Sequence, residues 1–258
     1  MKQFLIIPDR KNLEESIQLA NEYALGYEYN EFFLPEILDD EEKTKEIIKT
    51  YKNSILPEYC TLHGAFFDVI PFSMDAKIRE VSELRIEQSI NIAREIGAKA
   101  VVFHTNYNPF LNTEKYIEEW VIENAKIWSD ILERHADINI YLENMFDTSP
   151  VILEKLSKEL CKYPNYGVCL DYAHAALSKV SPETWAERLG KYVKHVHIND
   201  NDFISDLHLP WGDGKIDRQR FYQAYEEHLN GATILIEMST MEKKLRSLKV
   251  LKAEGFLN

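Results

Sequence analysis

Short apolar runs alternate with longer amphipathic stretches along this chain, and that alternation restricts its fold more than any other feature. The stretches between the runs have the 3.6-residue spacing of amphipathic helices, most clearly in 75–96 and 113–133. The pattern predicts an α/β fold with a single (β/α)8 barrel as first choice and a doubly wound open sheet as the alternative. The eight predicted strands fall near residues 3–7, 27–33, 59–66, 99–105, 138–144, 166–171, 193–199 and 232–238.

Local signals place several helix ends. The pairs Ser149-Pro150 and Ser181-Pro182 predict helices with proline at the first helical position, and Thr113 precedes another helix. Gly97 follows the 75–96 stretch and predicts its end, because glycine readily adopts the left-handed conformation that terminates helices.

The length of 258 residues suits one barrel domain over 1–258, and no linker or repeat divides the chain. The residues after Met1 form too short an apolar run for a signal peptide, and no run approaches the roughly 20 residues of a membrane span. The three cysteines lack a CxxC spacing, which argues against a disulfide framework or a cysteine zinc site. We therefore expect a cytoplasmic protein without a membrane segment, and assembly into a homo-oligomer stays open.

Six of the predicted strands end in a histidine or a carboxylate, where turn residues are more usual. In a closed barrel the carboxyl ends of the strands lie on one ring, whereas an open sheet would spread them along a line. The repetition therefore favours the barrel and predicts one polar site at its carboxyl-terminal end. The six runs are Thr61–His63, Val101–His104, Ile140–Glu143, Gly167–Asp171, Val193–His197 and Ile234–Glu237.

Four of these residues, Glu143, Asp171, His197 and Glu237, are the predicted metal ligands. Carboxylates with one imidazole make a hard, mostly oxygen site, suited to Mn, Zn, Co or Mg with open positions for a substrate. Any one of them alone could be a loop carboxylate or a core histidine. Four in register at successive strand ends argue against that interpretation.

A second set of residues could add further metal ligands or bind the substrate, so that more than one ion is allowed. Asp206 and His208 are alternate residues, and in an extended segment their side chains would face the same way. His174 follows Asp171 by one short turn and could join them. The set is completed by two histidines at earlier strand ends, His63 and His104.

The remaining polar and aromatic residues receive weaker predictions. His135 and His228 are expected on helix surfaces, and His195 is expected to fill the barrel or support a metal ligand. Trp211 could line a substrate pocket, and the residues 199–201 could cap, form turns or bind hydroxyls.

These motifs together resemble the xylose-isomerase-like TIM-barrel superfamily, which includes sugar isomerases and epimerases as well as endonuclease IV. The resemblance covers essentially the whole chain. It implies that Glu143, Asp171, His197 and Glu237 hold the catalytic metal of the epimerases. With His63, His104, His174, Asp206 and His208 added, the matching positions of endonuclease IV hold three zinc ions. The resemblance rests on Leu142-Glu143-Asn144, Gly167–His174, His197–Asp200, Asp206–Pro210 with Gly212-x-Gly214-x-Ile216-Asp217, and Glu237.

The charge of the chain favours a small carbohydrate over nucleic acid as the substrate. The net charge is −13, and the stretch Tyr29–Glu42 contains six carboxylates and no Lys or Arg. A phosphate backbone placed there would be repelled, without the counterion release that drives DNA binding. A zinc phosphoesterase acting on abasic DNA is therefore the alternative, and a non-catalytic metal-binding barrel is a third possibility.

The predicted reaction is proton transfer at a carbon next to a carbonyl, through a metal-stabilised enediolate. Glu143 and Glu237 are the expected catalytic pair, one removing the proton and the other returning it. Bases on opposite faces give epimerisation, and one base acting on a cis-enediol gives isomerisation. The chain lacks a Gly-rich phosphate cradle, which favours a free sugar over a sugar phosphate.

Overall fold

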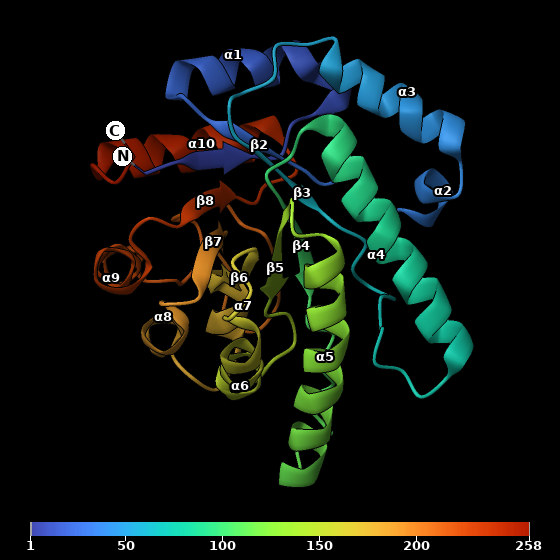
Figure 1. Ribbon diagram of the computed structural model, residues 1–258. Coiled ribbons are helices and arrows are strands. Elements are labelled where there is room, and N and C mark those ends of the chain that lie inside the picture. Colours follow the sequence, from blue (N-terminus) through green and yellow to red (C-terminus); the bar gives the residue numbers. More distant parts are fainter. Residues whose placement is uncertain (1, 258) are drawn as a thin grey trace.

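The computed structural model describes residues 2–257 and shows a closed barrel of eight parallel strands (Figure 1). Each strand pairs with its sequence neighbours, and the pairs Phe4↔Ile234 and Ile6↔Ile236 close the ring between the first and last strands. The barrel prediction is confirmed and the open-sheet alternative is wrong. The strands are β1 Phe4–Ile6, β2 Gly26–Tyr29, β3 Cys60–His63, β4 Ala100–His104, β5 Asn139–Glu143, β6 Tyr166–Asp171, β7 Val193–Ile198 and β8 Thr233–Ile236.

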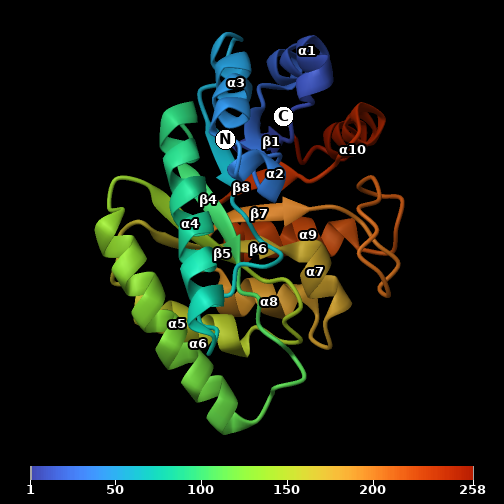
Figure 2. The same ribbon diagram turned by 90° about the vertical axis from the view of Figure 1, so that its right-hand side faces the viewer.

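Helices surround the barrel and cover the outer face of its strands (Figures 1 and 2). Among the described residues, no helix is both long enough and apolar enough to cross a bilayer. The helices are η1 Arg10–Asn12, α1 Leu13–Tyr23, α2 Pro35–Leu38, α3 Glu41–Lys52, α4 Ala76–Ile96, α5 Glu114–Arg134, α6 Val151–Leu160, α7 Tyr172–Leu177, α8 Pro182–Leu189, α9 Arg218–Ala224, the π-helical η2 Tyr225–Leu229 and α10 Met241–Ala253.

Capping residues explain where the clearest helices begin and end. The side chains of Asp75, Thr113 and Ser181 accept hydrogen bonds from backbone N–H groups in the first turns of α4, α5 and α8. Gly97 ends α4 with a φ of +83°, as predicted. Helix α6 begins one residue later than predicted, because Pro150 is its cap and not its first residue.

Side-chain alternation divides the apolar residues into two layers. A small cluster inside the barrel contains Ala100, Val102, Tyr141 and Cys169, whereas the large core lies between the strands and the helices. Residues two positions further along these strands, such as His104, Glu143 and Asp171, have the same parity. The interior of the barrel therefore has a small apolar cluster at mid-height, with the buried His195 beside Cys169, and is strongly polar at the carboxyl ends of the strands.

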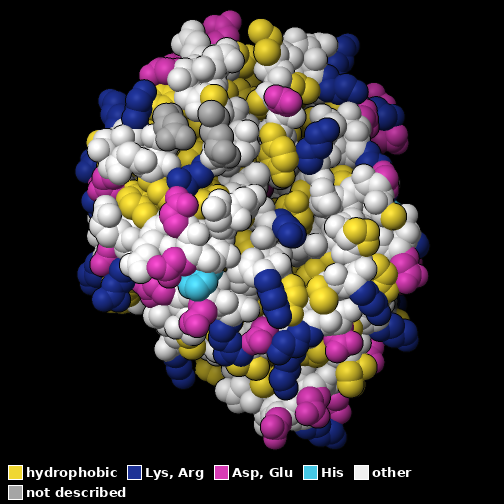
Figure 3. Space-filling view, turned by 60° about the vertical axis from the view of Figure 1, so that its left-hand side comes forward, with side chains coloured by type: hydrophobic (Ala, Val, Ile, Leu, Met, Phe, Trp, Pro, Cys, Tyr) yellow, Lys and Arg dark blue, Asp and Glu magenta, His cyan; other side chains and the backbone are white. Residues whose placement is uncertain are grey.

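Charged side chains of both signs are intermingled on the face of the molecule drawn in Figure 3, with apolar groups between them.

His135, predicted to be a surface group, is 6% exposed. Its ring nitrogens lie 2.8 Å from Arg94 Nη2 and 2.9 Å from Glu87 Oε1, so that it is buried in an ion-pair network between α4 and α5. The surface prediction for His135 is wrong, because these partners satisfy its polar atoms away from water. His228 lies on η2, and its side chain is one-third exposed.

Candidate metal centre

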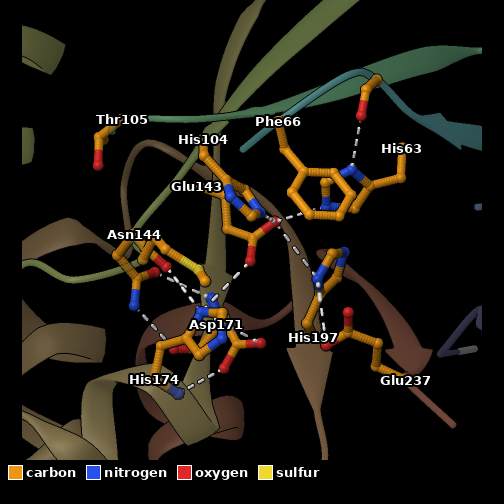
Figure 4. Close-up of polar contacts among 12 residues, drawn as sticks. His63, Phe66, His104, Thr105, Glu143, Asn144, Asp171, His174, His197 and Glu237 are labelled. Carbon is orange, nitrogen blue, oxygen red and sulfur yellow. Dashed lines mark hydrogen bonds and ion pairs between the residues drawn. The ribbon is translucent and has the colours of Figure 1, made fainter. Parts of the chain in front are cut away.

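The structure brings eight of the nine predicted site residues together in three groups of potential ligands, most of which are labelled in Figure 4, whereas Glu237 lies near His197 but in none of these groups. Within each group, one ligand atom from every residue lies within 4.8 Å of the others. Glu143 belongs to two of the groups. The groups are His63/His104/Glu143, Glu143/Asp171/His197 and His174/Asp206/His208.

Glu143 is the central residue of this arrangement. Its Oε2 lies 3.4 Å from His63 Nε2, 3.5 Å from His104 Nε2 and 3.5 Å from His197 Nδ1. Its Oε1 lies 3.5 Å from His174 Nδ1. Burial raises the pKa of Glu143, but the surrounding imidazoles, His197 foremost, outweigh burial and hold it well below its ordinary value. Glu143 is therefore a fully buried anion surrounded by imidazole nitrogens.

Asp171 is placed by the junction of β6 and α7. It caps α7, accepting a hydrogen bond from His174 N at 2.6 Å, and the side chain of Asn144 bonds both its backbone N–H and its carbonyl. Burial, together with repulsion from Glu237 and Glu143, raises the pKa of Asp171 to about 7. A cation among these carboxylates would remove that repulsion. Asp171 could therefore bind a cation together with the neighbouring carboxylates of Glu143 and Glu237.

The third group depends on the β7–α9 loop, which projects beyond the strand ends (Figure 2). Asp206 Oδ2 lies 3.0 Å from His208 Nε2 and 3.4 Å from His174 Nε2. The extended conformation predicted for Asp206–His208 is wrong at His208, whose φ is +43°. This left-handed turn is held in place because Lys243 Nζ donates to the His208 carbonyl at 2.8 Å.

Asp200 organises the base of the same loop. Its carboxylate accepts hydrogen bonds from the backbone N–H groups of Gly212 and Ile216, each at 3.0 Å. A Cβ at Gly214 would lie 2.3 Å from Asp200 Oδ1, so only glycine fits beside this clamp. The oxygens of Asp200 are thus committed to the backbone, which fits the predicted turn-forming role and leaves hydroxyl binding unsupported.

Backbone carbonyls orient three of the site imidazoles. His63 Nδ1 donates to Gly64 O at 3.1 Å, His174 Nδ1 to Asn144 O at 2.9 Å, and His208 Nδ1 to Glu237 O at 3.2 Å. In each case the proton on Nδ1 leaves the lone pair of Nε2 directed at the ligand group. Such outer partners are typical of histidines that bind metals.

The residues present fit a divalent metal. Four buried atoms that face the groups have no hydrogen-bonding partner among the described residues: Glu143 Oε2, Asp171 Oδ2, His174 Nε2 and His197 Nδ1. Buried polar atoms are rarely left unpaired, since each costs free energy comparable to a lost hydrogen bond. Nitrogen and carboxylate ligands suit Zn, Mn or Co. The chain therefore has buried groups that could hold one or more ions.

Glu28 of β2 is a site residue that the sequence prediction missed. It is fully buried, and its carboxylate lies 3.1 Å from His195 Nε2 and 3.2 Å from His197 Nε2. The available signal was a charged residue within the aromatic run Gly26–Tyr29. His195 is buried inside the barrel, as predicted, and contacts Glu28, whereas its support of a metal ligand stays a prediction. With Cys169, the two histidines form a fourth group of possible ligands.

Trp211 does not line a pocket. Its side chain is completely buried, its ring packs edge-on against Phe221 at 5.1 Å, and its Nε1 donates to the Tyr222 hydroxyl at 3.2 Å. The prediction of a substrate contact is wrong, because the Gly212 turn directs the indole into the core beneath α9.

An aromatic strip leads outward from the candidate metal ligands. The ring of Phe66 lies 4.8 Å from the His63 ring and 4.9 Å from the His104 ring (Figure 4). It also lies 4.3 Å from Phe67, which is 62% exposed. The side-chain amide of Asn106 fixes this loop by donating to the carbonyls of Phe66 and Val69. One wall of the site is therefore apolar from the ligands to the solvent.

The acidic stretch after β2 is partly neutralised by bases from other elements. Arg10 pairs with Glu31 at 2.7 Å, and Arg85 on α4 pairs with Asp39 at 2.6 Å. Lys45 of α3 pairs with Glu41 one turn earlier. Half of the six carboxylates thus have a basic partner, and the stretch repels anions less than its sequence alone suggests.

Comparison with known proteins agrees with this architecture. The sequence profile described as "Xylose isomerase-like TIM barrel" matches residues 18–254, which is most of the chain. The chain belongs to this family. This xylose isomerase-like barrel is 30% identical over 202 residues to the uncharacterized protein MJ1311 of Methanocaldococcus jannaschii, covering 74% of the chain and 68% of that protein.

Two solved structures have the same fold as this xylose isomerase-like barrel. The TTHB071 protein of Thermus thermophilus, from a zinc chloride soak, superimposes with a TM-score of 0.79 at 21% identity, covering 98% of this chain and 97% of that one. A D-tagatose 3-epimerase-like protein superimposes with a TM-score of 0.77 at 24% identity, covering 98% of each chain. The superpositions establish a common fold, and at identities this low they establish the fold alone.

Proposed function

We propose that this chain is a divalent-metal-dependent isomerase or epimerase of a small carbohydrate. The observation that carries the proposal is the position of two carboxylates beside one imidazole nitrogen. Glu143 Oε2 lies 3.5 Å and Glu237 Oε2 lies 3.8 Å from His197 Nδ1, and the two glutamates come from different strands. Together with Asp171, these residues would hold the ion, and both glutamates would border a sugar bound to it.

The chemistry then follows from the two glutamates. A bound divalent ion polarises a carbonyl and its neighbouring hydroxyl, which acidifies the adjacent C–H bond. One glutamate accepts that proton, and the other delivers a proton to the same carbon from the opposite face, which gives epimerisation. Return of the proton to the neighbouring carbon by a single glutamate gives isomerisation. Asn199 Nδ2 donates to Glu237 Oε2 at 3.3 Å and holds this base in place.

Two features support a carbohydrate substrate. The apolar strip formed by Phe66 and Phe67 suits the C–H face of a sugar, and the acidic stretch after β2 retains carboxylates that form no ion pair with any described residue. The likeness to a D-tagatose 3-epimerase-like protein points in the same direction. We prefer a free sugar to a sugar phosphate, because the chain lacks a Gly-rich phosphate-binding turn.

A second candidate function is a zinc phosphoesterase acting on abasic DNA. The observation that favours it is the presence of three ligand groups, including His174/Asp206/His208 in the β7–α9 loop. Several ions close together stabilise both the attacking and the leaving oxygen of a phosphoryl displacement. A one-metal epimerase does not need that third group.

Solvent exchange tests the two functions against each other. Protein loaded separately with Mn²⁺, Co²⁺ or Zn²⁺ is incubated in D₂O with a panel of ketoses, and deuterium at the carbon next to the carbonyl is measured by NMR. We expect metal-dependent incorporation that Glu237→Gln abolishes. Metal-dependent cleavage of an abasic duplex, without exchange into any ketose, would reject the proposal in favour of the phosphoesterase.

A further inference from the structure

His197 is oriented differently from the other site histidines. His63, His174 and His208 direct Nδ1 at backbone carbonyls and Nε2 at the ligand groups. His197 is reversed: Nδ1 lies 3.5 Å from Glu143 Oε2, and Nε2 points to the layer beneath. The polar atom it meets there is Glu28 Oε1 at 3.2 Å. A carboxylate thus takes the place that a backbone carbonyl has for the other three.

The Glu28 carboxylate is itself fixed in one orientation. Thr61 donates its hydroxyl to Oε2 at 2.7 Å, and His195 Nε2 lies 3.1 Å from the same oxygen. His195 is held in turn by Thr233, whose Oγ1 lies 2.6 Å from its Nδ1. Oε2 therefore has two partners, whereas Oε1 and the His197 Nε2 that faces it at 3.2 Å each lack a hydrogen-bonding partner among the described residues. The geometry leaves Oε1 available for His197.

The buried negative charge of Glu28 needs a compensating positive charge, which has to come through the histidines that face it. The side chain is completely buried, and its ion pairs among residues 2–257 are with His195 and His197, without a lysine or arginine. A buried carboxylate with no cation is costly. A divalent ion on Nδ1 of His197 would place positive charge at the far side of the imidazole, and the carboxylate would polarise that ring toward the metal.

We propose that Glu28 is a positioning residue that holds His197 with its Nε2 proton toward Oε1 and its Nδ1 lone pair toward Glu143 and Asp171. The inference rests on the metal centre of the proposed function. Cys169, His195 and His197 are also close enough to share an ion. Both nitrogens of His195 already face partners, Glu28 and Thr233, so the geometry favours the orienting role over a separate metal site.

Zinc affinity tests this role without requiring a substrate. The dissociation constant of Zn²⁺ is measured by competition with a chromophoric chelator for the wild type, Glu28→Ala and Glu28→Gln. We expect Glu28→Ala to weaken binding roughly 10- to 100-fold, the usual cost of removing an outer partner of a ligand. Glu28→Gln should lose less, because its amide oxygen can still accept from Nε2.

Two control variants separate orientation from general destabilisation. Thr61→Val removes one of the two groups that hold Oε2 and leaves His195 in place, so its zinc affinity should fall less than that of Glu28→Ala. Leu156→Ala cuts into the core under α6 and does not touch Glu28, so it should lower stability without lowering zinc affinity. Circular dichroism confirms folding, and Glu28→Gln carries the test if Glu28→Ala does not fold.

A second measurement detects the proposed hydrogen bond from His197 Nε2 to Glu28 Oε1 directly. In zinc-loaded protein with ¹⁵N-labelled histidine, the Nε2 proton of His197 should give a downfield resonance that exchanges slowly with water. Glu28→Ala should lose that resonance, and His197→Gln identifies it.

If folded Glu28 variants bind zinc within twofold of wild type, or if Leu156→Ala loses as much affinity as Glu28→Ala, the positioning role is wrong while the proposed function stands. Absence of zinc binding by the wild type would instead reject the metal centre on which both depend.

Discussion

Glu143 Oε2 lies 3.5 Å from His197 Nδ1, although the strands that carry them, β5 and β7, are separated by β6. Closure of the barrel makes this possible, because side chains of one parity point inward from every strand and meet near the axis. Asp171 from the intervening strand joins them. A single carboxylate thereby links two ligand groups, which makes Glu143 the most sensitive position in the site.

Replacement of Glu143 by glutamine should disable both groups that share it. The neutral amide keeps the shape of the side chain but removes the anionic ligand and the proton acceptor. We expect the number of bound ions to fall, and deuterium exchange into a ketose to drop at least about 100-fold, as expected for loss of a general base. Elemental analysis of purified variant and wild type gives the first quantity, and NMR gives the second. A fully metal-loaded, active Glu143→Gln would contradict the shared-ligand arrangement.

Asp206→Asn separates the two candidate functions. Asp206 contacts His174 and His208, and within the described part of the chain it forms no ion pair with Glu143 or His197. We expect the variant to bind fewer ions than wild type while retaining carbohydrate exchange within a few-fold. Its matched control is Asp202→Asn, which changes a half-buried carboxylate in the same loop whose partners are backbone amides. If Asp206→Asn abolishes exchange as completely as Glu143→Gln, the third group belongs to the carbohydrate chemistry.

The sequence could predict the barrel and the convergence of the strand-end residues, because both follow from periodicity. Alternation fixes which face of a strand is inward, and closure brings successive strand ends onto one ring. Asp171 and His197 illustrate this: they are paired in register across β6 and β7. Such relations need no knowledge of loop conformation.

The loops and the interior layer could not be predicted in the same way. His208 lies at a positive φ that depends on a contact from Lys243 in a distant helix. Trp211 is buried because of how the turn at Gly212 packs, which no local pattern encodes. Glu28 was missed because its partners, His195 and His197, follow it by more than 160 residues. Long-range packing decides each of these positions.

Phe67→Ala should weaken substrate binding without disabling the chemistry. Phe67 is the outer, 62% exposed end of the strip that begins at Phe66. Loss of its ring removes apolar contact made equally in the ground and transition states, so KM should rise several-fold with kcat little changed. Phe110→Ala is the control, since Phe110 is 91% exposed in the following loop. Equal effects of the two substitutions on KM would argue that the strip has no specific part in binding.

Lys244→Met should stabilise the protein at neutral pH, and by an amount that shrinks as the pH rises. Lys244 is fully buried on α10, and its Nζ has no hydrogen-bonding partner among the described residues. Burial lowers its pKa from 10.5 to about 8, against the attraction of Asp9. Below pH 8 the folded chain must bury the charge. Between pH 8 and 10.5 the folded lysine is neutral while the unfolded one still binds a proton, so wild-type stability increases with pH in that window.

The size of this effect follows from the same shift. At about 1.4 kcal/mol for each pKa unit, Lys244→Met should gain up to about 3 kcal/mol at pH 7. Urea unfolding of metal-free protein at several pH values measures the difference, which should approach zero above pH 10. Lys249→Met, at an exposed position of the same helix, should show no such trend. A Lys244→Met advantage that stays constant from pH 7 to pH 10 would mean that it comes from apolar packing and not from relief of a buried charge.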